Sequence, residues 1–249
     1  MRTDIQSLAE KCLYNWLGYG NENSKIWFMG MEEGGSEIWR QQTKTLEESL
    51  QLRSGYKIGM DFQHVWEDLY GIPLESFKGP TVWRYMAAFL LSMKGEEPSG
   101  EKIRSYIFEE KKLGKRESDH FLCEFLPLPR KSNTDIEDYQ SMWTSNSSYI
   151  KSVGARRFEL IKETLLKNSD VSLLISYDRK FTSAALAHFQ SELLLKWEDK
   201  RFKEYAIYTV RLTPDRNVYF LTTPFFGQGK ASYEGLYFAA KKIKELAIL

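Results

Sequence analysis

The chain has 249 residues, a length that fits one large α/β domain or two smaller ones. With 42% hydrophobic and 28% charged residues and no apolar stretch of membrane-spanning length, it is typical of a folded protein rather than of a disordered, fibrous or membrane-spanning one. The 35 Lys and Arg nearly balance the 34 Asp and Glu, which excludes an indiscriminate basic nucleic-acid binder, so any nucleic-acid site has to be local.

The aromatic, cysteine and histidine content excludes only some kinds of functional site. Aromatic residues make up 14% of the chain, more than a minimal core needs, and they serve either to fill a core or to stack on flat ligands. Cys12 and Cys123 lie outside any CxxC spacing, and the three histidines lack metal-ligand spacing. We therefore expect no disulfide, no metal and no cofactor. The start of the chain has no secretory segment, so we expect a reduced, cytoplasmic setting.

Hydrophobic periodicity predicts helices and strands that alternate along most of the chain. Helices are predicted where apolar side chains recur every three to four residues, and buried strands where short apolar runs end at turn residues. The predicted segments are a helix over 5–17, a loop over 18–23, a strand over 25–29, a helix over 82–92 with Thr81 as its N-cap, a helix over 102–113, a strand over 121–126, a helix over 158–166, a strand over 171–176, a helix over 182–195, strands over 205–212 and 218–222, and a helix over 233–246.

This alternation indicates a single domain over residues 1–249 with an α/β fold. The expected architecture is a three-layer sandwich around a mainly parallel sheet of about four strands. Ligands of such folds bind at the carboxyl ends of the strands. That rule predicts that the site is formed by four loops, over residues 30–36, 126–133, 176–181 and 222–230.

The first of these loops combines unobstructed backbone amides at Gly30 and Gly34 with two acids, Glu32 and Glu33. A carboxylate at a strand end can act as a general base on water or stabilise a cationic transition state. The alternative is a surface turn whose acids cap the next helix. The segment matches neither a Walker loop nor a dinucleotide-binding GxGxxG motif.

Two other loops carry candidate phosphate ligands. After the prolines of the loop over 126–133 come Arg130, Lys131 and Ser132, and the loop over 222–230 ends with Gln228 and Lys230. The alternative for the first is a proline-stiffened connection with a solvated basic end, and for the second it is two core phenylalanines followed by a flexible turn.

In this order, the loops resemble those of the uracil-DNA glycosylase superfamily, and the resemblance spans nearly the whole chain. The shared features are a strand ending in Gly-x-x-x-Gly, a middle strand with a polar residue before a proline-bearing loop, a strand-helix unit, and a last strand that ends in a turn before the terminal helix. In that family the first motif reads Gly-Gln-Asp-Pro-Tyr or Gly-Glu-Ala-Pro-Gly and the last reads His-Pro-Ser-Pro. This chain has Gly30-Met31-Glu32-Glu33-Gly34 and Thr223-Pro224-Phe225-Phe226, so the glycines and one proline are shared.

The resemblance implies catalytic roles for Glu32 and Thr223. Glu32 takes the place of the acid that positions water or steadies the oxocarbenium-like sugar, and Thr223 that of a His that supports the departing base oxygen. Glu124 takes the place of an Asn that reads the base edge. Because an ionised Glu accepts from N–H groups but cannot donate to a carbonyl, a base that presents donors fits better than uracil.

The implied reaction flips a nucleotide into the pocket, stacks its base on an aromatic side chain and hydrolyses the N-glycosidic bond. The expected partner is nucleic acid, DNA in the first place, or a nucleotide, with no membrane and no obligate protein partner. The predicted substrate contacts are Gly30, Met31, Glu33, Gly34, Trp39, Glu124, Pro127, Tyr177 and Phe225, and the predicted phosphate contacts are Arg130, Lys131, Ser132, Gln228 and Lys230.

Two other functions stay open. One is a non-catalytic member of the same fold that binds a nucleotide or nucleic acid, and the other is an unrelated α/β small-molecule hydrolase whose acids are structural. Under the glycosylase and binding hypotheses Glu32, Glu124 and Thr223 converge on one pocket with an aromatic wall. Under the hypothesis of an unrelated hydrolase they lie apart from one another.

Overall fold

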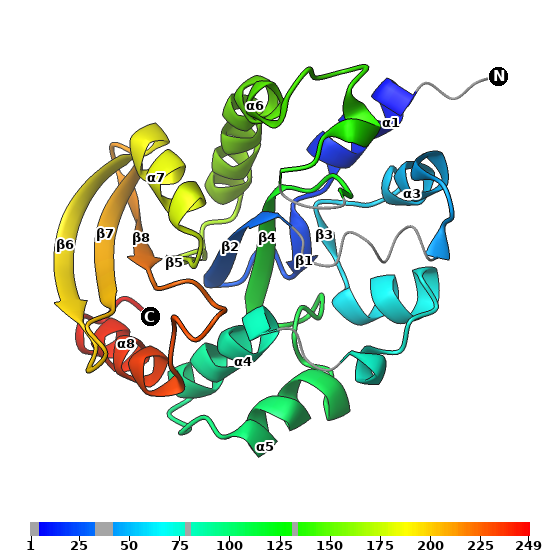
Figure 1. The fold of residues 1–249 in the computed structure, drawn as a ribbon. Helices are drawn as coiled ribbons and strands as arrows, with labels where there is room; N and C mark the ends of the chain where they lie inside the picture. The colour runs from blue at the N-terminus through cyan, green and yellow to red at the C-terminus, as the bar shows by residue number, and fades with distance from the viewer. Residues whose placement is uncertain (1–4, 33–41, 78–80, 131–133) are drawn as a thin grey trace.

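The computed structural model describes residues 5–32, 42–77, 81–130 and 134–249. In these residues one mixed sheet is covered by helices on both faces (Figure 1). The helices are α1 (Ile5–Asn15), α3 (Leu46–Arg53), α4 (Thr81–Met93), α5 (Gly100–Arg104), α6 (Asn146–Lys167), α7 (Arg179–His188) and α8 (Tyr233–Glu245), with shorter helical turns at His64–Leu69, Leu74–Ser76, Ser105–Glu109 and Glu137–Tyr139. Among the described helices, none has the length and apolar character needed to cross a bilayer.

The sheet has the strand order β3-β1-β4-β2-β5-β8-β7-β6. Its strands are β1 (Gly18–Gly20), β2 (Ile26–Glu32), β3 (Gly59–Met60), β4 (His120–Leu126), β5 (Leu173–Ser176), β6 (Gln190–Glu198), β7 (Glu204–Thr213) and β8 (Arg216–Thr222). The neighbours β4, β2, β5 and β8 are parallel, so their carboxyl ends meet at one edge. Antiparallel pairing adds β1 beside β4, and β7 and β6 beyond β8.

The predicted α/β class is therefore confirmed, whereas the expected size of the sheet is wrong. Eight strands are present in the described residues instead of about four. The additional strands are β1, β3 and β6, which are short, glycine-bearing or exposed and therefore lack the continuous apolar run that marks a central parallel strand.

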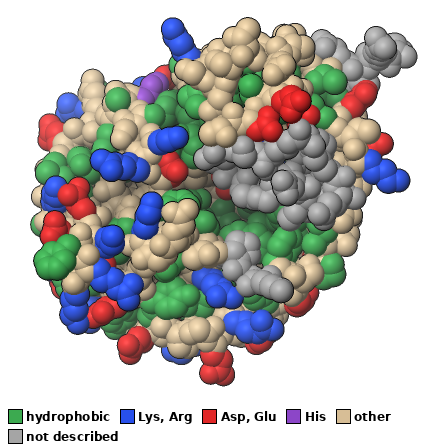
Figure 2. All heavy atoms as spheres, viewed as in Figure 1, with side chains coloured by type: hydrophobic (Ala, Val, Ile, Leu, Met, Phe, Trp, Pro, Cys, Tyr) green, Lys and Arg blue, Asp and Glu red, His purple; other side chains and the backbone are tan. Residues whose placement is uncertain are grey.

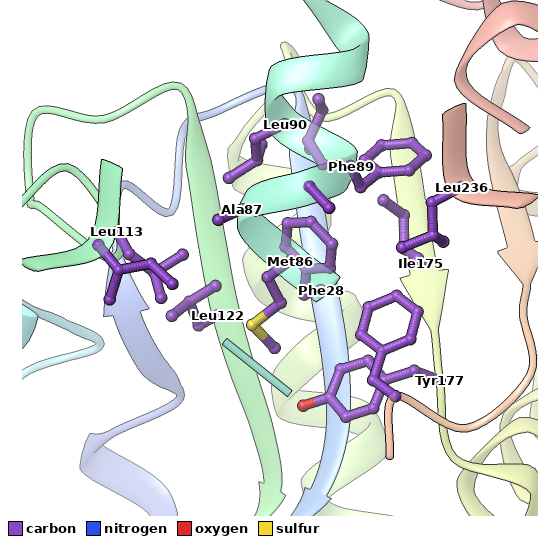
Figure 3. Packing of buried hydrophobic residues seen from close by; sticks show 14 of the residues in the cluster. Phe28, Met86, Ala87, Phe89, Leu90, Leu113, Leu122, Ile175, Tyr177 and Leu236 are labelled. Carbon is purple, nitrogen blue, oxygen red and sulfur yellow. The ribbon is translucent and has the colours of Figure 1, made fainter. Parts of the chain in front are cut away.

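Each face of the sheet has its own apolar core, because successive side chains of a strand point to opposite faces. In β2, Phe28 belongs to the cluster that includes α4 and α8, while Trp27 and Met29 belong to the cluster that includes α1, α6 and α7. Phe28 meets Phe89 of α4 edge to face at 6.0 Å between ring centroids, and Figure 3 shows the two together.

Pairing between strands overrides the helical pattern expected for residues 182–195. The helix α7 ends at His188, and the following residues form β6, which pairs with β7 along its whole length. The apolar run over 193–195 is compatible with either structure when it is considered alone. The neighbouring strand decides, because it satisfies the backbone N–H and C=O groups of the exposed edge.

Other ends of helices and strands differ from the predicted ones for local reasons. The segment Gly18–Gly20, expected in a loop, is β1, which fits between β3 and β4. Thr81, the expected N-cap, is itself the first residue of α4. The helix α6 begins at Asn146, well before the predicted start, because a capping box between Ser145 and Ser148 satisfies its first amides.

A fully buried cation, Arg157 of α6, ties three segments together. Its guanidinium donates to the carbonyl oxygens of Phe125 at 2.8 Å, Glu124 at 2.6 Å, Trp16 at 2.8 Å and Leu13. Burial lowers the pKa of Arg157 to about 10, so the group stays charged at neutral pH. The hydrogen bonds to carbonyls replace the water that a buried charge has lost.

We expect Arg157→Met to reduce the free energy of unfolding by roughly 3–5 kcal/mol, because the carbonyl oxygens lose their buried partner. Urea denaturation followed by circular dichroism measures the change. The control is Arg156→Met, since Arg156 is exposed and lies over the Tyr14 ring at 3.7 Å. It should cost less than about 1 kcal/mol. Equal losses in the two variants would show that the buried bonds do not organise the fold.

A buried histidine, His120 at the start of β4, is held in its neutral form. Its Nε2 accepts from the Gly114 N–H at 2.8 Å, so Nδ1 carries the proton and donates to Asp119 at 3.0 Å. Burial lowers the pKa of His120 below its ordinary value, and the hydrogen bond from His120 lowers the pKa of Asp119.

Stability should therefore fall as the pH drops below 6.5, the ordinary pKa of histidine. In that range the unfolded chain binds a proton at His120 that the folded chain does not, which favours unfolding. Above it the group makes no pH-dependent contribution. The variant His120→Gln, compared with the wild type by urea denaturation from about pH 7.5 to about pH 5, should show a flatter decline. Parallel curves would contradict this assignment.

Candidate functional site

The carboxyl ends of the four parallel strands bring several predicted site residues to one place. Gly30 of β2 and Glu124 of β4 are directly opposed in register. Tyr177 follows β5 and Thr223 follows β8, and the Thr223 N–H donates to the Ser176 carbonyl at 2.9 Å. Residues from four separate segments therefore share one edge of the sheet, as the rule for parallel α/β folds predicts.

The absence of a side chain at Gly30 makes room for two oxygen atoms. A Cβ atom at this position would lie 2.4 Å from the Tyr177 hydroxyl and 3.0 Å from Oε2 of Glu124. Only glycine fits so close to both groups, which therefore converge above β2. Figure 3 shows the Tyr177 ring at the end of the apolar cluster beyond Phe28 and Met86.

An aromatic wall borders these oxygens. The Tyr177 ring stacks on Phe226 with 4.9 Å between centroids and 9° between planes, and Tyr85 of α4 packs against Phe226 at 5.6 Å. Tyr177 and Phe226 are both buried. Burial, and then the charge of Glu124, raise the pKa of Tyr177 well above its usual value. The hydroxyl therefore stays protonated and is available as a hydrogen-bond donor.

Glu124 brings a carboxylate into this apolar setting, with 8% of its surface exposed. Its backbone is held from two sides, because its N–H donates to the Leu17 carbonyl at 2.7 Å and its carbonyl accepts from Arg157. A buried carboxylate needs hydrogen-bond donors. Its Oε2 atom faces the space above Gly30, beside the Tyr177 hydroxyl.

The Thr223 hydroxyl forms hydrogen bonds within the protein. Its hydroxyl lies 3.3 Å from the Ser176 carbonyl and 3.0 Å from the Pro224 carbonyl, both as donor. The single hydroxyl proton is used within the protein, so Thr223 braces the end of β8 against β5. It is not placed as a donor to a departing base.

Arg130, expected to bind phosphate, is also used within the protein. Its side chain is buried, its Nη1 donates to the Asp135 carbonyl at 3.2 Å and to Oδ1 of Asn146, and its guanidinium lies over the Tyr149 ring at 5.0 Å. This cation fastens the loop after β4 to the start of α6, and its phosphate contact stays a prediction. Pro127 in the same loop is buried.

The remaining described site residues divide between core and surface. Met31 packs with the cluster of α1, α6 and α7, on the face opposite Tyr177. Phe225 is half-buried with its ring folded over Gly227. Gln228 and Lys230 are exposed and open to a ligand. Glu33, Gly34, Trp39, Lys131 and Ser132 lie outside the described residues.

For Glu32 only the backbone is described: it ends β2 and pairs with Leu126. Sequence reasoning did not assign Tyr85 or the stacking role of Phe226. The aromatic pair Phe225-Phe226 was a visible signal, but which ring turns inward depends on the packing against α4. No local pattern could distinguish Tyr85 from the other apolar positions of its helix.

No known protein family matches this chain, and a search of curated proteins finds no similar sequence.

We expect Gly30→Ala to lower the free energy of unfolding by about 1–3 kcal/mol, because the added methyl group displaces the buried Tyr177 ring. Gly100→Ala is the matched control: nothing lies within 4 Å of its Cβ position at the start of α5. It should be neutral or stabilising by up to about 1 kcal/mol. Urea denaturation of both variants tests this. If Gly30→Ala left the free energy of unfolding unchanged, as Gly100→Ala should, the close approach of Tyr177 and Glu124 to Gly30 would be contradicted.

Proposed function

We propose that this protein is a glycosylase that hydrolyses the N-glycosidic bond of a damaged or deaminated base flipped out of DNA, with a fold like that of the uracil-DNA glycosylase superfamily. The observation that carries the proposal is the convergence of the Tyr177 hydroxyl and the Glu124 carboxylate over Gly30, beside the stacked ring of Phe226. A donor, an acceptor and a flat apolar wall are what a nucleobase requires of a pocket.

Base recognition would use the two oxygens together. Glu124 accepts from an N–H group, and Tyr177 donates to a ring nitrogen or carbonyl. The preferred base therefore presents an N–H beside an acceptor on one edge. The sequence alone predicts a base that presents donors, because an ionised Glu only accepts. Tyr177 adds a donor to the site, so a base that also presents an acceptor fits.

The hydrolysis step is assigned to Glu32, the acid at the end of β2. Its carboxylate takes a proton from the attacking water as the water oxygen bonds to the anomeric carbon, or stabilises the oxocarbenium-like sugar. The departing base leaves with the electron pair of the glycosidic bond. Tyr177 and Glu124 hold the base so that the bond faces the water.

A second candidate function is binding of a nucleotide or nucleic acid without catalysis. The position of Thr223 favours it, because this hydroxyl donates to the carbonyls of Ser176 and Pro224 and leaves the departing base without that donor. The same pocket would then hold a base without releasing it.

Oligonucleotides that carry uracil, hypoxanthine, xanthine or an alkylated base test the proposal, with abasic sites as the readout. We expect release of at least one of these bases. Glu32→Gln should slow release by about 10²–10⁴-fold, because it removes the proton acceptor. Tyr177→Phe should weaken binding of the base, because it removes the donor. The control is Glu117→Gln, because Glu117 is an exposed acid in the segment that precedes β4. This substitution should not change the rate of base release.

Release of none of the bases, with Glu32→Gln binding the oligonucleotides like the wild type, would overturn the enzymatic proposal. Binding that is weakened by Tyr177→Phe in the absence of any release would favour the second candidate instead.

A further inference from the structure

The hairpin between β6 and β7 presents an exposed aromatic side chain at its tip. Phe202 is 84% exposed, and its φ of +57° lies in the left-handed region. A bulky side chain rarely adopts this conformation, because its Cβ crowds the backbone. The residue therefore gains nothing from the core and carries backbone strain. Strain at an exposed aromatic residue points to a role outside the folded chain.

The tip is a preorganised turn. Oδ1 of Asp199 accepts from the Arg201 N–H at 2.8 Å and from the Lys203 N–H at 3.0 Å. The Phe202 N–H donates to the Asp199 carbonyl at 2.9 Å, and Lys200 pairs with Glu234 of α8 at 2.6 Å. These bonds hold the turn against α8 with Phe202 projecting, so a ligand would meet a fixed ring.

The topology places this tip at the same edge of the sheet as the candidate site. Both β6 and β8 are antiparallel to β7, so β6 runs parallel to β8 and ends where the four parallel strands end. The tip joins β7 and β6, which are three and four strand spacings from β2, about 14–19 Å at about 4.8 Å each. That separation spans about four to six nucleotide steps of about 3.4 Å. Figure 1 shows the hairpin beside α8.

Two cations flank the ring. Arg201 is exposed and Lys203 half-exposed, and neither forms an ion pair with the described residues. The acid in the turn, Asp199, faces the backbone N–H groups, and Glu204 pairs with Lys196 at 2.6 Å. Basic and acidic side chains are interspersed over the face in Figure 2, so phosphate contacts have to be made by a few local cations of this kind.

We propose that this tip is a second nucleic-acid contact, in which Phe202 stacks on a base several nucleotides away from the flipped one while Arg201 and Lys203 contact the phosphates next to that base. The inference rests on the proposed function, since nucleic acid is the ligand that the pocket suggests. It concerns a contact several nucleotides away from that pocket. Stacking on an aromatic ring tolerates any base, so the contact would add affinity without sequence preference.

Fluorescence anisotropy with an undamaged, labelled 20-mer, single-stranded and duplex, measures the contact over a series of salt concentrations. Phe202→Ala should raise Kd about tenfold with little change in the salt dependence. Arg201→Ala should raise Kd and lower the slope of log K against log salt by about 0.7–0.9, the value for one phosphate contact. Leu166→Ala is the control, because Leu166 is an apolar residue that is 40% exposed near the end of α6, which leads into the amino end of β5 at the opposite edge of the sheet.

A second variant separates binding from folding. Phe202→Gly removes the ring and places at this position the residue that adopts positive φ freely, so its Tm should be equal to or above that of the wild type while its Kd rises as in Phe202→Ala. An unchanged Kd in both variants would overturn the inference. Binding to vesicles of phosphatidylserine with no binding to either DNA would also overturn it, in favour of a membrane surface.

The result is independent of base release. A Kd raised by Phe202→Ala, in a protein that releases no base, would support the hairpin contact and refute the enzymatic proposal. Base release by a protein whose DNA binding is unchanged in Phe202→Ala would support the enzymatic proposal and refute the hairpin contact.

Discussion

The buried guanidinium of Arg157 is the interaction on which the site depends. A charge without water is tolerable only when hydrogen bonds replace its hydration, and here backbone carbonyls of β4 and of the residues at the end of α1 do so. Because these carbonyls belong to segments far apart in the chain, one side chain fixes their relative positions. Glu124 is one of the residues held in this way, so the placement of the buried carboxylate follows from that of the buried cation.

The parallel strands bring the carboxylate fixed in this way to the candidate site. Their carboxyl ends lie at a common edge, where Gly30 leaves the space that the Tyr177 hydroxyl and the Glu124 carboxylate occupy. The Tyr177 ring is in turn packed face to face on the buried ring of Phe226. Polar groups in an apolar setting interact strongly with complementary groups, because they have already lost their water. The same groups would lower stability if the packing around them failed.

The hairpin of β6 and β7 places an exposed aromatic residue at the edge of the sheet where the candidate site lies. It pairs with the parallel core through β8 and ends at the same edge. Its strained Phe202 and its flanking cations are exposed, whereas Arg130, in a loop close to the parallel core, is buried and used for packing. Cations near a proposed nucleic-acid site thus differ in function according to their burial, which composition does not reveal.

The pattern of residues was sufficient to predict the α/β class, the central strands that hold Gly30 and Glu124, and the loop that holds Tyr177, because apolar period and turn residues act locally. Local pattern could not predict that residues 190–195 form a strand, since that depends on pairing with β7. Nor could it show that Arg130 and Thr223 donate within the protein. Hydrogen-bond partners and burial are set by segments distant in the chain, and only the tertiary structure brings those together.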